Sequence, residues 1–379
     1  MTVISSIESA DAPPQKPQAS TPPLPTAKTA SPRNPLWDIV RGLGMVFVVV
    51  GHGFGGDIER FVNLFHIPLF FFVSGLVFKF IGQSFLDALV FLRKSLKSLW
   101  WPSLRYGAFF VLAHNLFVRW GLYDLPRYGL AETAMALARH VAFFKTERLE
   151  GAMWFLTALS VGRVLLYAVS WLSSAVSDHA PGTRLAVEIS LVGCFFAMGC
   201  AAFYLRLDVP GNADAACSLL PFLYAGSKLK KMDLANPWIV CSGLIVLVFL
   251  FLFVLGDRTV NMSRNHIVSP VFFLLSSASG IATSFGLAAM LKHCPFLAGA
   301  VALVGRHTIP VLCLHLLAFR AVSWLWMTIG GLPPAVLSKH PIVASSFSWG
   351  ALYTTAGILL PLTIPALETL LSKFKRTSP

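Results

Sequence analysis

The segment Leu36-Trp-Asp-Ile-Val-Arg-Gly-Leu-Gly-Met-Val-Phe-Val-Val-Val-Gly-His52 is apolar except for three ionisable side chains, Asp38, Arg41 and His52. A helix of about 20 apolar residues is long enough to cross the hydrocarbon core of a bilayer. Residues 36–54 are therefore predicted to form a membrane-spanning helix that holds these three side chains within the membrane or at its edges.

The composition of the whole chain extends this prediction. Of its 379 residues, 56% are hydrophobic and 12% are charged, whereas about a quarter of the residues of an average soluble domain are charged. We therefore expect an all-α, polytopic integral membrane protein that contacts the lipid bilayer.

Nine further apolar segments follow the first one. The expected spans are residues 36–54, 61–80, 98–118, 152–172, 185–204, 214–227, 237–255, 267–290, 300–327 and 345–371. The sequence predicts a bundle of about ten transmembrane helices, formed by residues 34–372. Residues 1–33, rich in Pro, Ser, Thr and Ala, are expected to be a disordered cytosolic tail, and residues 373–379 a short basic tail.

The basic residues give the expected orientation. The chain has 30 Lys and Arg against 17 Asp and Glu, a formal net charge of +13. In a soluble protein this excess would suggest a nucleic-acid partner, but in a membrane protein basic residues concentrate in cytoplasmic loops. With the N-terminus in the cytosol, the inner connections and the C-terminal tail carry Arg93, Lys94, Lys97, Arg184, Lys228, Lys230, Lys231, Lys292, Lys373, Lys375 and Arg376. We expect a multi-pass protein of the bacterial inner membrane, with both termini cytosolic and no nucleic-acid partner.

The connection formed by residues 119–151 departs from this pattern. It would lie outside, yet it carries five basic and four acidic residues. Within it, residues 131–144 have the amphipathic pattern of a helix that lies in the membrane interface.

Ionisable side chains within a membrane span are functional candidates because they are costly to insert, by roughly 2.5–3.5 kcal/mol at the helix centre. Arg41 and His52 are eleven residues apart, so on a helix they share one face and lie about 16 Å apart along its axis. The structural alternative is that Asp38 and Arg41 form an ion pair at the helix start while His52 caps its outer end.

A second histidine follows the first span. His66 stands two residues before Pro68, near the expected outer start of the second span, and Asp57 and Glu59 precede it. We expect His66 to face His52 across a short loop, although an isolated histidine is more often a hydrogen-bonded structural residue. The glycines of residues 51–56 match G-x-G-x-x-G by letter, but a dinucleotide site requires a preceding strand.

Further polar groups occur in later segments. Arg306 and His315 are nine residues apart, so a straight helix would point them to different sides; Pro310 could kink the helix between them. Arg93 and Lys94 lie in a basic segment at the inner face, which suits lipid headgroups or a phosphate-containing ligand.

Several classes of enzyme are excluded by what the sequence lacks. It has no G-x-S-x-G, H-E-x-x-H or Walker A motif and no carboxylate metal cluster. Its six cysteines contain no C-x-x-C pair. We expect neither a serine hydrolase, a zinc protease nor an ATPase, and no bound metal or cofactor.

Five segments in order resemble the membrane acyltransferases of the acyltransferase-3 family, in particular the branch of fucose 4-O-acetylase-like and xanthan-type exopolysaccharide O-acetyltransferases. They are Trp37-Asp-Ile-Val-Arg41 through Gly51-His52, Phe65-His-Ile-Pro-Leu-Phe-Phe-Phe-Val-Ser-Gly75, Trp154-Phe-Leu-Thr-Ala-Leu159, Val260-Asn-Met262, and Gly305-Arg-His-Thr-Ile-Pro through Leu314-His315. The second segment is the most specific of the five.

The resemblance implies transfer of an acyl group, usually acetyl, from acyl-CoA to a sugar hydroxyl. His52 matches the family's essential first-helix histidine, Arg41 the arginine eleven positions before it, and Asp57 an acidic residue found in some members. Arg93 and Lys94 match its basic segment, although the arginine spacing of some members is not reproduced.

Acyl transfer needs a base for the hydroxyl proton and donors for the oxyanion. We expect His52 to be the base and Asp57 its orienting partner, with His66 as a further catalytic candidate and acetyl-CoA as the donor substrate. The candidate residues for binding CoA or the carbohydrate acceptor are Arg41, Asp38, Arg93, Trp154, Arg306 and His315. The alternatives are a transporter or flippase for a lipid-linked sugar, and an accessory subunit of the polysaccharide assembly machinery, with which the enzyme itself could also associate.

Overall fold

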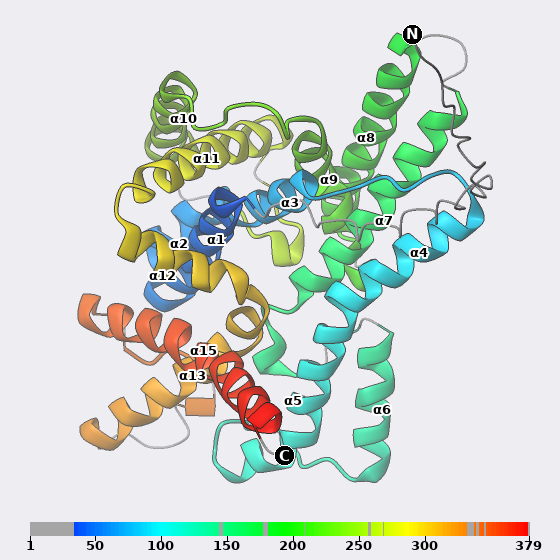
Figure 1. The fold of residues 1–379 in the computed structure, drawn as a ribbon. Helices are drawn as coiled ribbons and strands as arrows, with labels where there is room; N and C mark the ends of the chain where they lie inside the picture. The colour runs from blue at the N-terminus through cyan, green and yellow to red at the C-terminus, as the bar shows by residue number, and fades with distance from the viewer. Residues whose placement is uncertain are drawn as a thin grey trace, which may run out of the picture. The chain divides into compact units, whose positions relative to one another are not determined.

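The computed structural model describes residues 34–142, 144, 147–176, 181–207, 209–256, 259–267, 269–331, 337–338, 341–344 and 346–377. Within these residues the secondary structure is helical, apart from one isolated bridge between Asn261 and His266 (Figure 1). The tail expected at residues 1–33 lies outside the described part of the chain. The last helix continues to Thr377, beyond the expected start of the C-terminal tail.

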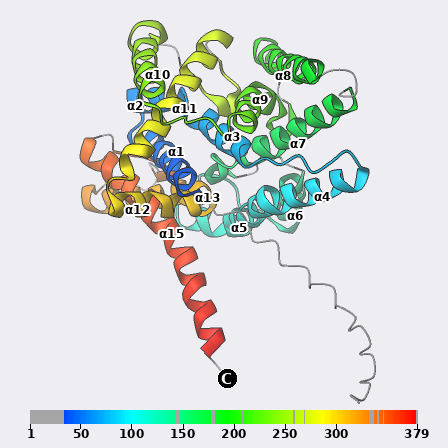
Figure 2. The same ribbon diagram turned by 45° about the horizontal axis from the view of Figure 1, so that its top comes forward.

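Seven helices are long and apolar enough to cross a membrane. They are α1 (Pro35–Phe54), α7 (Trp154–Ala175), α8 (Pro181–Tyr204), α10 (Pro237–Phe249) with its π-helical continuation η4 (Leu250–Leu255), α11 (Pro270–Leu291), α13 (Thr308–Gly330) and α15 (Phe347–Thr377). They match seven of the ten expected spans and indicate an integral membrane protein of the all-α class. The C-terminal part of α15 runs clear of the other helices (Figure 2).

The other three expected spans take different forms. Residues 61–80 do not make one helix, because the chain breaks at Leu64 and Phe65 between α2 (Gly56–Asn63) and α3 (His66–Leu76). Residues 214–227 form α9 (Ala213–Lys228), which is also short. In α3 every residue except Ser74 is buried. An apolar run of this length is typical of a buried core helix rather than of a complete crossing.

Residues 98–118 belong to a longer helical segment. It consists of α4 (Phe85–Ser95), the π-helical turn η1 (Leu96–Trp100) and α5 (Trp101–Arg119). The expected amphipathic helix after it is present as α6 (Leu130–Val141), which buries Ala136 and His140.

The prediction of a single helix over residues 300–327 is wrong. The chain forms α12 (Pro295–Arg306) and α13, which are separated at His307. Pro310 lacks the N–H that a continuous helix would bond to the carbonyl of Arg306. The break therefore lies three residues before the proline, where the end of α12 packs against the start of α1.

Glycines let α1 approach its neighbours closely. A Cβ atom on Gly42 would lie 1.9 Å from the carbonyl oxygen of Val301, and one on Gly305 would lie 1.8 Å from that of Asp38. Around α1 also pack α2, α3, α11, α13 and α15. The first helix is thus enclosed by other helices, as its ionisable side chains require.

The pair α3 and α9 is held in the same way. A Cβ atom on Gly75 would lie 2.1 Å from the carbonyl oxygen of Leu223, and one on Gly226 would lie 2.0 Å from that of Phe72. Small residues at such crossings allow the backbone contact that drives helix association in membranes. This contact fixes α3, whose first residue is His66.

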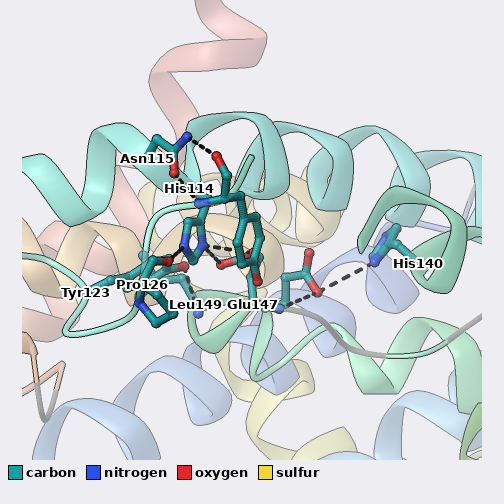
Figure 3. A network of polar contacts seen from close by, with 9 residues as sticks. His114, Asn115, Tyr123, Pro126, His140, Glu147 and Leu149 are labelled. Carbon is teal, nitrogen blue, oxygen red and sulfur yellow. Dashed lines mark hydrogen bonds and ion pairs between the residues drawn. The ribbon is translucent and has the colours of Figure 1, made fainter. Parts of the chain in front are cut away.

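A buried polar network holds the connection between α5 and α7 (Figure 3). His114 Nδ1 lies 3.0 Å from Glu147 Oε2, and His114 Nε2 lies 3.0 Å from the carbonyl oxygen of Pro126. The ring also stacks on Tyr128 with centroids 3.6 Å apart. Because the carbonyl can only accept, Nε2–H donates to it, and Nδ1 faces the carboxylate.

His140 anchors α6 to the same network. Its Nε2 donates to the carbonyl oxygen of Ser103 over 3.1 Å, and its Nδ1 lies 3.5 Å from Glu150 Oε2. The backbone N–H of Glu147 in turn faces Glu150 Oε2 at 3.4 Å. Residues 147–150 are therefore tied to α5 and α6, which fixes the position of Trp154 at the start of α7.

The close contact between α3 and α9 gives a stability prediction. We expect Gly75→Ala to lower the free energy of unfolding by about 1–3 kcal/mol, because the added methyl group meets a backbone carbonyl that cannot rotate away. In Gly193→Ala the methyl group meets nothing within 4 Å, and the better helix propensity of alanine should keep or raise stability. Thermal unfolding in detergent measures both, and equal melting temperatures would contradict the predicted backbone contact.

The network predicts a pH dependence of stability. Burial alone would lower the pKa of His140, but the hydrogen bond and charge of Glu150, with the Ser103 carbonyl, raise that pKa above its ordinary value of 6.5. A raised pKa means that the folded state binds the proton more tightly, so this stabilisation is complete below pH 6.5 and is lost as the pH rises through the raised pKa.

We therefore expect the difference in melting temperature between the wild type and His140→Gln to shrink between about pH 6 and pH 9. Thermal unfolding across this range is the measurement. A difference that stays constant with pH would show that His140 acts through packing alone.

Candidate functional site

A cavity of about 100 Å³ lies where α1 ends. Its walls come from α1, α2, α3, the start of α7 and the loop before α11. The polar residues that line it are His52, Glu59, Asn63, His66, Trp154, Asn261 and Ser263. The expected proximity of His52 and His66 is confirmed, since the two side chains line one cavity.

The tautomer of His66 leaves one ring nitrogen as a hydrogen-bond acceptor in this cavity. Its Nδ1 donates to the carbonyl oxygen of Val62, the residue four positions earlier, over 2.7 Å. The loop between α2 and α3 brings this carbonyl beneath the ring. Because Nδ1 carries the proton, Nε2 carries the lone pair.

His315 lies behind His52. The two rings stack with centroids 5.4 Å apart and an interplanar angle of 18°. His315 Nδ1 lies 3.0 Å from the carbonyl oxygen of Val311 and 2.9 Å from that of Leu312, so it donates within its own helix. Its Nε2 is buried and has no hydrogen-bond partner among the residues that the structure describes. Three histidines from α1, α3 and α13 therefore gather at one place, two of them with Nδ1 committed to backbone carbonyls.

Asp38 and Arg41 lie at the opposite end of α1. Asp38 is buried, and its Oδ1 is 3.7 Å from Nη1 of Arg41. An acidic residue in the first turn of a helix is favourable because it faces the positive end of the helix dipole. This geometry agrees with the ion-pair alternative for Asp38 and Arg41, whereas His52 lines a cavity rather than serving as an exposed cap.

The acidic residue at the cavity is not the one expected from the sequence. Asp57 has a side chain that is 77% exposed, it pairs with Arg60 over 2.7 Å, and it does not line the cavity. Glu59 lines it instead, and burial raises the pKa of this carboxyl. Two positions along a helix turn the side chain by about 200°, which is why Glu59 and not Asp57 faces His52.

The remaining candidates are distributed as follows. Trp154 lines the histidine cavity and also a smaller one of about 20 Å³ that it shares with His140 and Glu150. Arg306 is exposed at the end of α12, and Arg93 is exposed on α4. The break at His307 separates Arg306 from His315, so the structure does not bring Arg93 or Arg306 to the histidines.

A much larger cavity adjoins the histidine cavity. It measures about 650 Å³, and Ser263 lines both. We call it the vestibule; its charged lining residues are Arg139, Arg206, Asp214 and Arg264. Arg139, Arg206 and Arg264 come from three distant segments of the sequence, so no local pattern links them.

The groups that line the histidine cavity are of the kind that transfers protons. Among the described residues, no group of three or more His, Cys, Asp or Glu side chains could hold a metal ion. Imidazole nitrogens, amide groups and an indole N–H line a partly closed space. Such a site can take a proton from a hydroxyl group and stabilise developing negative charge.

Comparison with known proteins found no relative of this chain. Neither a protein-family model, nor a curated protein, nor a solved structure matches this chain.

Proposed function

We propose that this protein is a membrane O-acyltransferase that transfers an acetyl group from acetyl-CoA to a hydroxyl group of a carbohydrate. The acceptor would be an exopolysaccharide, a lipopolysaccharide or a lipid-linked oligosaccharide. The observation that carries the proposal is the shared cavity of His52 and His66, with His315 stacked behind His52.

In the proposed reaction the acceptor oxygen attacks the thioester carbonyl carbon of acetyl-CoA. His52 takes the hydroxyl proton, the carbon–sulfur bond breaks, and the proton passes to the departing CoA sulfur. The stacking on His315 restricts the orientation of the His52 ring. The lone pair on His66 Nε2 can accept a hydrogen bond from a second hydroxyl group of the carbohydrate and so hold the reacting hydroxyl beside His52.

Donors for the oxyanion are available in the same cavity. Asn261 Oδ1 accepts hydrogen bonds from the backbone N–H and the hydroxyl of Ser263, at 3.1 and 2.7 Å. Its amide nitrogen is thereby directed away from Ser263 as a donor. With Asn63 and the indole N–H of Trp154, it is a candidate to stabilise the tetrahedral intermediate.

The donor substrate would enter from the other end of α1. Gly305 packs against the carbonyl of Asp38, so Arg306 and Arg41 belong to the same end of the bundle. Arginines are well suited to phosphate groups such as those of CoA. This end would be cytosolic, as the distribution of basic residues favours, with both termini in the cytosol and the protein in a bacterial inner membrane.

The proposal predicts the effect of removing the base. We expect His52→Ala to insert and fold but to lose at least about 100-fold in acetyl transfer, the usual contribution of a general base. The measurement is acetyl content of the surface polysaccharide by NMR, and acetyl transfer by purified protein. His293→Ala, which removes an exposed histidine outside the cavity, is the matched control and should be unaffected.

Normal acetylation in His52→Ala cells would end the proposal. Release of free CoA, measured with and without acceptor, separates the transferase from a transporter, which would move its sugar substrate without consuming acetyl-CoA. Loss of the polymer itself, rather than of its acetyl groups, would favour an accessory subunit.

A further inference from the structure

The vestibule has the size of a ligand site. Its volume of about 650 Å³ lies within the range of about 300–1,000 Å³ that is usual for small-molecule sites. Its walls come from the end of α6, the end of α8, the 3₁₀ turn η3 (Pro210–Asn212) with the start of α9, and the loop at Ser263 and Arg264. Ser263 also lines the histidine cavity, so the vestibule and the cavity of His52 and His66 meet at this residue.

The charge of the vestibule is positive. Its lining residues include three arginines, Arg139, Arg206 and Arg264, and one carboxylate, Asp214. Within the described residues no ion pair engages any of the three arginines. Their guanidinium groups are therefore available to a ligand from solution.

The backbone around the vestibule is unusual. The described residues other than glycine with positive φ are Arg206 (55°), Asn212 (53°) and Asn265 (48°). The first two line the vestibule and the third follows Arg264. Asparagine tolerates this left-handed conformation, but an arginine adopts it rarely.

Arg206 occupies the position after α8 at which glycine is the usual residue. Leu207 N–H donates to the carbonyl of Ala202 and Arg206 N–H to that of Phe203, the pattern of a left-handed helix end. A glycine would form this turn without strain but would bring no charge. A strained residue at a ligand-sized cavity points to a role for its side chain.

The loop that carries Arg264 is held against the same helix. The side-chain amide of Asn265 donates to the carbonyl oxygen of Gly199 over 2.8 Å. This hydrogen bond ties the loop before α11 to α8. Arg264 and Arg206 are thereby kept on the walls of one cavity.

We propose that the vestibule binds an oxyanion of the acceptor carbohydrate, either the carboxylate of an acidic sugar or the diphosphate of a lipid-linked sugar. Arginine forms paired, charge-assisted hydrogen bonds with both groups. The inference rests on the proposed transferase function for the identity of the acceptor, but binding itself is measured without acetyl transfer. The vestibule would select an anionic acceptor and present a neighbouring hydroxyl to the histidine cavity.

The test is isothermal titration calorimetry on the full-length protein in detergent with four probes. These are tetragalacturonate, the neutral maltotetraose, inorganic pyrophosphate, and adenosine 3′,5′-bisphosphate as the head group of CoA. We expect tetragalacturonate or pyrophosphate to bind at least about tenfold more tightly than maltotetraose, and the binding to weaken with added salt. Which of the two anions binds identifies the source of the oxyanion.

The decisive variant is Arg206→Gly. Glycine suits the left-handed backbone at this position, so the melting temperature should be kept or raised while anion binding falls by about tenfold. Arg264→Gln should show the same loss of binding. Arg105→Gln, which neutralises an exposed arginine on α5, is the control and should bind as the wild type does.

Three results would each overturn the inference. The first is equal binding of the acidic and neutral oligosaccharides together with no binding of pyrophosphate, and the second is unchanged anion binding in Arg206→Gly and Arg264→Gln. The third is binding of the bisphosphate that these variants abolish. The last would make the vestibule a donor site. His52→Ala should keep anion binding, so failure of the transferase proposal and failure of this one give different results.

Discussion

The enclosure of α1 by other helices is the constraint on which the rest of the structure depends. An ionisable side chain facing lipid is penalised, and α1 carries three of them within 20 residues. In a bilayer there is little hydrophobic driving force between helices, so close backbone packing has to hold them together. Gly42 and Gly305 supply that packing on one side of α1. The break between α12 and α13 then follows, because the chain must turn where α12 meets the start of α1.

This enclosure also separates two chemical environments along one helix. Asp38 and Arg41 lie at its start, and His52 lies about 16 Å further along. In the proposed reaction the two substrates need not enter by one route. Under that proposal a flexible pantetheine arm held at the start of α1 would have to bring the thioester to the histidines, while a bulky carbohydrate would approach through the vestibule. In that case the length of α1 would set the distance between the two substrate entrances.

The sequence predicts the long helices well and the breaks poorly. Apolar length alone identified α1, α7, α8, α10, α11, α13 and α15, because a bilayer imposes a minimum length on each crossing. It joined α2 to α3, because that break depends on tertiary contacts that have no local signal. It also joined α12 to α13, although Pro310 is a local signal for that break.

The same limit applies to the candidate site. The proximity of His52 and His66 could be predicted, because only a short loop separates them. The stacking of His52 on His315 could not, since more than 260 residues of chain lie between them. Glu59 and Asp57 point to different sides of α2. The sequence does not say which side of α2 faces the cavity, so it could not favour Glu59. The arginines of the vestibule come from positions 139, 206 and 264. Nothing in the sequence indicates that residues so far apart along the chain lie around one cavity.

The buried histidines among the described residues fall into two kinds, which differ in how their ring nitrogens are bonded. In His114 both ring nitrogens face acceptors and the ring is stacked, so the group is satisfied and rigidifies the connection before α7. In His66 and His315, Nδ1 donates to backbone carbonyls, and within the described residues the buried Nε2 of His315 has no hydrogen-bond partner. Buried groups without a partner are rare in folded proteins and call for a specific reason. Trp154 touches both regions, since it lines the histidine cavity and the small cavity beside His140 and Glu150. The satisfied network thus fixes Trp154, which forms part of the wall of the cavity that His52 and His66 line.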